Sequence, residues 1–204
     1  MSTYNGSGFQ SLQNNSAPWS RISDRDVFGD DLSVLSGNEA SKDRVKSEIQ
    51  EYSILLFSAL GKSIPVPGDP SGDNHRYVLQ LPGDETFGEE DLKGLDLRSA
   101  KLVVLSACET QVGKRLAGDE LMSLARSFLA SGASSVIATL WKVDDFSASQ
   151  IIGRFFSYLK AGFHPAEALH RAQAEFREEQ RLLQGRDTYE WAPFVLIGTA
   201  GPAA

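Results

Sequence analysis

The residue of this sequence best suited to covalent chemistry is its single cysteine, Cys108. A cysteine attacks as the thiolate, so a reactive one needs a base or positive potential that lowers its pKa from about 8.5. One cysteine also excludes an intramolecular disulfide framework and a zinc site built from cysteines. Free cysteines are among the most buried residue types, so position alone favours a small core side chain. The residues around Cys108 therefore have to decide between chemistry and packing.

The composition suits one globular domain and excludes several partners. The 204 residues are 41% hydrophobic and 23% charged, as in soluble domains. The net charge of −7 argues against nucleic acid and anionic membranes as partners. No apolar run approaches the roughly 18–20 residues of a membrane span, and no signal-peptide pattern opens the sequence, so we expect a cytoplasmic location. Three histidines without paired spacing predict no metal site, and no phosphate-loop pattern or other cofactor motif occurs.

The sequence predicts a flexible leader over residues 1–30, one domain over 31–200 and a tail over 201–204. Half of the first twenty residues are Ser, Asn or Gly, which is typical of a segment without a core. Trp19 and Phe28 are the leader residues most suited to local docking. Packed structure is expected from about Leu32 onward.

Within the domain, short apolar runs alternate with helical patterns. The runs 52–57, 77–81, 102–105, 135–140 and 191–197 predict strands, and 40–50, 88–94, 121–129, 147–160 and 165–183 predict helices. The Gly- and Pro-rich stretch 61–70 predicts a loop. Strands separated by helices imply a parallel sheet covered on both faces. The predicted fold is α/β with three layers.

Three predicted loops leave the sheet at the same edge. Cys108 follows the strand 102–105, Leu60 and Gly61 follow the strand 52–57, and residues 141–145 follow the strand 135–140. Sites in open parallel sheets form at the carboxyl ends of the strands. We therefore expect one crevice there, which would hold a peptide or protein ligand.

The segment around the cysteine, Lys-Leu-Val-Val-Leu-Ser-Ala-Cys-Glu-Thr-Gln-Val-Gly at 101–113, resembles the nucleophile segment of CHAT domains. These are caspase-like cysteine peptidase domains that are often attached to tetratricopeptide repeats. The resemblance continues at 124–133, 138–145, 164–169 and 191–198, and upstream at 37–42 and 94–97. It covers roughly residues 35–198 and implies a caspase-like, mostly parallel sheet between helices, with Cys108 at the nucleophile position.

The resemblance also implies a catalytic histidine, which this sequence lacks. The family's strand and loop usually read His-Phe-Ala-Thr-His-Gly, and the corresponding residues here are Leu-Phe-Ser-Ala-Leu-Gly at 56–61. Leu60 takes the place of the catalytic histidine, and leucine cannot accept a proton. Gly61 is kept, and the family implies an oxyanion hole built with its backbone N–H and that of Cys108. The sequence therefore predicts a degenerate or pseudo-peptidase that acts as a binding or regulatory module.

Two other readings stay open, so the sequence does not decide whether the chain is an enzyme. The chain could be an active cysteine endopeptidase that takes a base from His75, from another loop or from a partner chain. It could also be a scaffold domain of a larger signalling complex. His164 and His170 are expected on a helix, in structural roles.

The loop after the strand 135–140 carries the remaining candidates. Trp141, Asp144 and Asp145 are predicted substrate-binding residues, because the place of this loop in the family suggests a pocket for a basic side chain. Capping of the helix 147–160 is an equally good role for Asp144 and Asp145.

CHAT domains usually carry further caspase-like structure before the matched segment, so the chain is expected to hold the catalytic half. It would then be a minimal form, part of an assembly or a truncated product. The missing half would leave a sheet edge exposed, which a homodimer or a partner chain would cover.

Overall fold

The computed structural model describes residues 9–13, 32–68, 70, 75–109, 117–182 and 189–199. The strands are β1 (Phe9–Gln13), β2 (Leu32–Ser36), β3 (Ile54–Pro65), β4 (His75–Gln80), β5 (Thr86–Gly88), β6 (Leu102–Glu109), β7 (Ser135–Thr139) and β8 (Phe194–Gly198). The α-helices are α2 (Lys42–Glu48), α3 (Glu89–Leu92), α4 (Ala117–Ala130), α5 (Asp145–Lys160) and α6 (Pro165–Leu182), and short 3-10 turns lie at Gly37–Glu39 and Pro82–Asp84.

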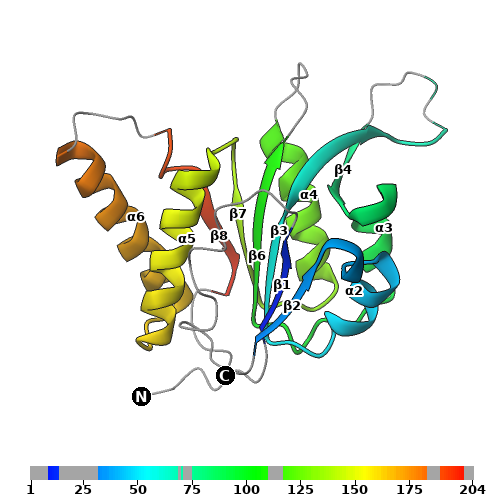
Figure 1. Cartoon of the computed structure of the whole chain (residues 1–204), viewed down its shortest axis with the longest axis horizontal. Helices are drawn as coiled ribbons and strands as arrows, with labels where there is room; N and C mark the ends of the chain where they lie inside the picture. The colour runs from blue at the N-terminus through cyan, green and yellow to red at the C-terminus, as the bar shows by residue number, and fades with distance from the viewer. Residues whose placement is uncertain are drawn as a thin grey trace.

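All eight strands belong to one mixed sheet. Its main path runs β2-β1-β3-β6-β7-β8, and β4 branches from β3 (Figure 1). β5 pairs with β4. The pairs β2–β1, β1–β3, β3–β6 and β6–β7 are parallel, whereas β7–β8, β3–β4 and β4–β5 are antiparallel. The prediction of a mostly parallel sheet is therefore confirmed.

The strand β3 changes partner along its length. Its first half, Ile54–Ser58, pairs with β1, and its second half, Gly61–Pro65, pairs with β4. On the other side, β6 follows β3 from Ile54 to Gly61. Where the two halves meet, Ala59 and Leu60 therefore pair with β6 alone.

Helices cover both faces of the sheet, which gives three layers. In Figure 1, α5 and α6 lie on one side of the strands, and α2, α3 and α4 lie on the other. Alternate residues of β3 divide between two cores, as the period of two in a strand requires. Leu55 and Phe57 belong to the core beneath α2 and α4, and Ile54 and Leu56 belong to the core beneath α5 and α6.

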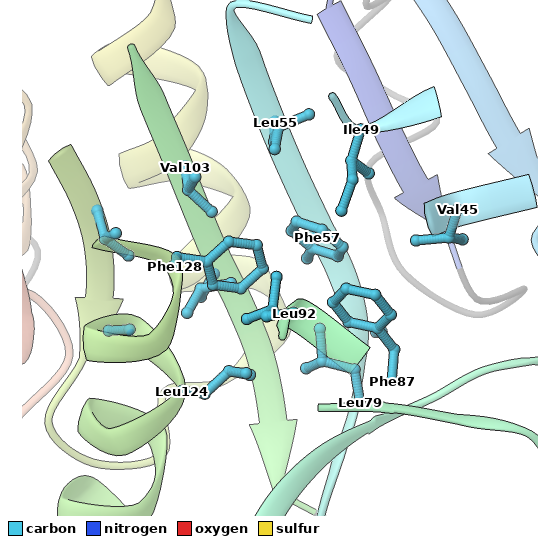
Figure 2. Close-up of a cluster of buried hydrophobic side chains, with 14 of the residues drawn as sticks. Val45, Ile49, Leu55, Phe57, Leu79, Phe87, Leu92, Val103, Leu124 and Phe128 are labelled. Carbon is cyan, nitrogen blue, oxygen red and sulfur yellow. The ribbon is translucent and has the colours of Figure 1, made fainter. Parts of the chain in front are cut away.

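An aromatic cluster fills the centre of the first core (Figure 2). The ring centroid of Phe57 lies 5.8 Å from that of Phe87 and 5.2 Å from that of Phe128. These three side chains are at most 1% exposed. They join a strand of the main sheet, the β4–β5 branch and α4, so the branch is packed into the domain.

Two predictions from the sequence are wrong in part. The loop expected from Gly61 begins only after Pro65, because pairing with β4 extends β3 and overrides the turn-forming composition. The expected leader contains β1, whose five residues pair with β2 and β3, so it does have regular structure at Phe9–Gln13. The domain boundaries otherwise stay a prediction, and Trp19, Phe28 and the tail lie outside the described residues.

Candidate functional site

Leu60 and Cys108 are register partners in the parallel β3–β6 ladder. Adjacent strands lie about 4.8 Å apart, and paired positions of a parallel ladder share a face of the sheet. The expected loop positions are wrong for both residues: each lies inside its strand, since β3 and β6 extend to Pro65 and Glu109. Leu60 is half-buried, and the side chain of Cys108 lies outside the described part of the structure. The backbone thus places an aliphatic residue beside the nucleophile position.

Gly61 lies in the interior of the sheet, paired with Glu109 on one side and with Leu79 on the other. A backbone N–H in this setting lies in the plane of the sheet and is directed at a neighbouring strand. A side chain at this position would also collide with Tyr77, because a Cβ would lie 1.6 Å from the Tyr77 hydroxyl and 2.2 Å from Cζ. Packing against Tyr77 is thus a structural reason for glycine at position 61. The oxyanion-hole role of Gly61 stays a prediction.

The histidines that were considered as a base lie elsewhere. His75 opens β4 and pairs with Pro65, five residues beyond Leu60 along β3. That separation corresponds to about 17 Å along a strand, whereas a general base must reach about 3 Å from the proton it takes. His170 is exposed on α6, and His164 precedes that helix, where its carbonyl accepts from the Ala168 N–H at 2.8 Å.

Trp141 lies two residues after the end of β7, at the same carboxyl edge of the sheet. Its indole Nε1–H donates to the carbonyl of Tyr189 at 2.7 Å, and the two ring centroids are 5.8 Å apart. The neighbouring Leu140 N–H donates to the carbonyl of Pro193 at 2.9 Å. Residues 189–193, directly before β8, therefore form the second wall of this loop. Periodicity in the sequence gave no sign of that contact, which spans 48 residues.

Asp144 caps α5, so the capping role expected for it is confirmed. One oxygen of its carboxylate accepts from the Ser147 N–H at 3.0 Å. Asp145 is exposed in the first turn of the helix, where its charge favours the positive end of the dipole. The pocket for a basic side chain stays a prediction for both residues.

A second carboxyl group, that of Glu190, lies beside Asp144 and was missed by the sequence analysis. Burial and a hydrogen bond to Asp144 raise the pKa of Glu190 above its ordinary value. Burial alone would raise the pKa of Asp144, but hydrogen bonds from Glu190 and Ser147 outweigh it and leave this pKa below its ordinary value. The two carboxyl groups therefore favour sharing one proton.

Apolar side chains stand exposed around this pair. Leu140 is 38%, Phe146 61% and Tyr189 50% exposed. The exposed Lys142 lies on the loop after β7, and the exposed acids Asp144 and Asp145 lie at the start of α5. We call the surface formed by Leu140, Trp141, Phe146 and Tyr189 the aromatic rim. Such a surface, apolar with acidic flanks, suits binding of another chain.

Other kinds of site find no support in the described part of the chain. It holds no cluster of three or more side chains that could ligate a metal ion. None of its helices combines the length and apolar character needed to cross a membrane.

A mostly parallel sheet between two layers of helices, with a cysteine near the carboxyl end of a central strand, defines the class: this is an α/β protein with a caspase-like arrangement. The family model of the CHAT domain matches residues 16–199. The chain belongs to the CHAT domain family.

Two curated relatives are tetratricopeptide repeat protein 28 of Mus musculus and of Homo sapiens. The mouse protein is 30% identical over 201 residues and the human protein 28% over 199. Each match covers 81% of this chain and 8% of the relative, so the chain spans a small part of their length.

Similarity to solved structures is weak. A crystal structure of a Geobacter sulfurreducens protein is 14% identical and has a TM-score of 0.49, with 96% of this chain and 94% of that one covered. A pyridoxal kinase from Staphylococcus aureus is 12% identical, with a TM-score of 0.37 and coverage of 83% and 86%.

Proposed function

We propose that this CHAT domain is a degenerate peptidase that binds a peptide or protein segment at the carboxyl edge of its sheet and does not cleave it. The observation that carries the proposal is the register of Leu60 with Cys108. A histidine at position 60 would supply general acid–base assistance, which contributes about 10²–10⁴-fold to such reactions. Leucine supplies none, and peptide cleavage also needs a proton for the leaving amine.

Binding is supported by the surface beside the nucleophile strand. The aromatic rim is exposed at the end of β7 and the start of α5, and the Trp141–Tyr189 contact gives it a fixed shape. Trp141, Asp144 and Asp145 are the proposed ligand-binding residues. The name of the relatives refers to tetratricopeptide repeats, and such attached repeats suit a role for this domain in protein–protein interaction in the cytoplasm.

The position of His75 counts against the alternative of an active endopeptidase, because it lies about 17 Å along β3 from Leu60. An active enzyme would need a base from a residue beyond the described part or from a partner chain. A homodimer or a partner chain at the sheet edge would be the source of such a base.

The proposal is tested with a mixed peptide library and a peptide-based covalent cysteine probe. The wild-type chain should bind library peptides, cleave none and show no more probe labelling than the Cys108→Ala variant. Phe146→Ser should weaken binding of the selected peptides at least several-fold, because Phe146 is the most exposed residue of the rim. Cleavage that disappears in Cys108→Ala would overturn the proposal in favour of the endopeptidase.

A further inference from the structure

Asp144 and Glu190 join two segments that are far apart in the sequence. Asp144 is the N-cap of α5, and Glu190 lies in the turn that precedes β8. Their carboxyl groups are hydrogen-bonded to one another. Two ionised carboxylates have no proton to donate, so the bond between the two carboxyl groups exists only while the pair holds one proton, whereas the bonds from the Asp144 N–H and the Ser147 side chain to Glu190 do not need it.

The burial of Glu190 points to the same conclusion. Its Oε2 atom is buried and, within the described part of the chain, has no hydrogen-bond donor. A buried acceptor without a partner costs about 1–3 kcal/mol. A proton shared with Asp144 lowers this cost, because a neutral carboxyl group is less costly to bury than a carboxylate.

The same two segments also carry the Trp141–Tyr189 contact. Trp141 is three residues before Asp144, and Tyr189 is directly before Glu190. Two interactions therefore hold the loop after β7 against the turn at residues 189–193. They are the indole hydrogen bond to the Tyr189 carbonyl, at 2.7 Å, and the carboxyl pair.

We propose that Glu190 is a positioning residue of the candidate site: by sharing one proton with Asp144, it holds the turn at residues 189–193 against the loop after β7 and keeps the aromatic rim assembled. This inference concerns regulation of the site and rests on the proposed function. When the shared proton is lost, the two carboxylates repel each other and only the hydrogen bonds from the Asp144 N–H and the Ser147 side chain still hold Glu190, so the turn is held less firmly. The rim is then a pH-dependent surface.

The pH range follows from the directions of the two pKa values. The pKa of Glu190 is raised above 4.5, so the stabilisation by its proton is complete below 4.5 and is lost as the pH rises through the raised value. The pKa of Asp144 is lowered below 3.8, so its contribution is lost as the pH falls through the lowered value. The singly protonated pair prevails between the two.

The charged side chains nearest this pair in the chain are Lys142 and Asp145, which lie on the loop and first helical turn beside Asp144. From α6, the guanidinium of Arg177 lies 5.5 Å from the ring centre of Trp191, next to Glu190 in the chain.

The test follows the indole N–H signal of Trp141 by NMR while the pH is raised, with the signal assigned from Trp141→Phe. In the wild-type chain the signal should shift with a midpoint above 4.5. Glu190→Gln should hold the signal at its low-pH position, because the amide donates to Asp144 at every pH above the pKa of that carboxyl. Asp144→Asn keeps an oxygen for the cap but removes the charge, so the midpoint should fall, while burial of Glu190 still holds it above 4.5.

Glu51→Gln is the matched control, since Glu51 is exposed before β3, at the opposite edge of the sheet. It should leave the wild-type curve unchanged. A wild-type midpoint at or below 4.5, or an unchanged midpoint in Asp144→Asn, would overturn the inference. If Glu190→Gln does not fold, the titration curves of the wild-type chain and of Asp144→Asn still test the inference. The Trp141 signal is measured without a bound peptide. If its midpoint shifts as expected but the chain binds no peptide, only the proposed function is refuted.

Discussion

Leu60 of β3 and Cys108 of β6 are direct partners in a parallel ladder. The relationship is fixed by eight consecutive pairs from Ile54–Leu102 to Gly61–Glu109, so it does not depend on one local contact. The position at which the resemblance implies a catalytic histidine is therefore adjacent to Cys108 and holds a side chain that cannot accept a proton. The following predictions test this arrangement and the packing around it.

Leu60→His should shift the reaction of Cys108 with iodoacetamide to lower pH. An imidazolium beside a thiol favours the thiolate and lowers its pKa by about one unit or more. The measurement is the alkylation rate as a function of pH, with Cys108→Ala to confirm the site of reaction. Lys62→His is the matched control, because Lys62 lies two residues further along β3, beyond the last pair with β6. Equal pH profiles of alkylation for Leu60→His and Lys62→His would contradict the adjacency of positions 60 and 108.

Gly61→Ala should lower the free energy of unfolding by about 1–3 kcal/mol, the usual cost of overpacking. The cause is the Tyr77 ring, which occupies the space that a Cβ would take. The same change in a Tyr77→Ala background should cost much less, so a double-mutant cycle in urea unfolding measures the coupling. Additive costs would show that Gly61 is required for another reason, such as its backbone N–H.

Asp144→Ala should lower the free energy of unfolding by about 1 kcal/mol at neutral pH, since α5 loses its cap. Asp144→Asn should lose little, because the amide oxygen can accept from the Ser147 N–H. The lowered pKa of Asp144 means that the advantage of aspartate holds above pH 3.8 and disappears as the pH falls through the lowered value. Thermal melts of the three proteins over a pH series measure this. Equal stability of the alanine and asparagine variants would contradict the capping role.

Phe128→Ala should lower the free energy of unfolding by about 3–5 kcal/mol, because Phe128 is fully buried against Phe57 and Phe87. Phe146→Ala should change it by no more than about 0.5 kcal/mol, because that side chain is 61% exposed. Chemical unfolding of both variants measures the contrast. A large loss in the Phe146 variant would mean that the rim packs within the domain and is not a free binding surface.

Local patterns in the sequence predicted much of this fold. The helical period placed α4 and α5 on the sheet, and Gly132 ends the α4 segment with a φ of 110°, a conformation that suits glycine. Apolar runs marked β6 and β7, which are buried on both faces. These elements can be recognised from the sequence because their buried positions recur with the period of a helix or a strand.

Local patterns did not predict which distant segments pair with one another. The extension of β3 depends on β4, whose residues Tyr77 and Val78 provide partners for a Gly- and Ser-containing stretch. The contacts of Tyr189 and Glu190 with the loop after β7 have no periodic signature, and a glutamate in a turn gives no sign of a buried carboxyl. The candidate site around Cys108 and Leu60 stays a prediction, and the contacts of residues 189–193 with the loop after β7 were missed.

The change of partner along β3 has a consequence for how this edge of the sheet can move. Opening the backbone at Gly61 requires bonds to be broken toward both β4 and β6, so its amide is expected to exchange slowly with solvent. The turn at residues 189–193 reaches the neighbouring loop through the indole bond of Trp141, the carbonyl of Pro193 and the carboxyl pair. The backbone around Gly61 is thus expected to open less readily than the turn at residues 189–193, which depends on these few contacts. A ligand that displaces any part of this edge would displace that turn first, and β3 would keep its position.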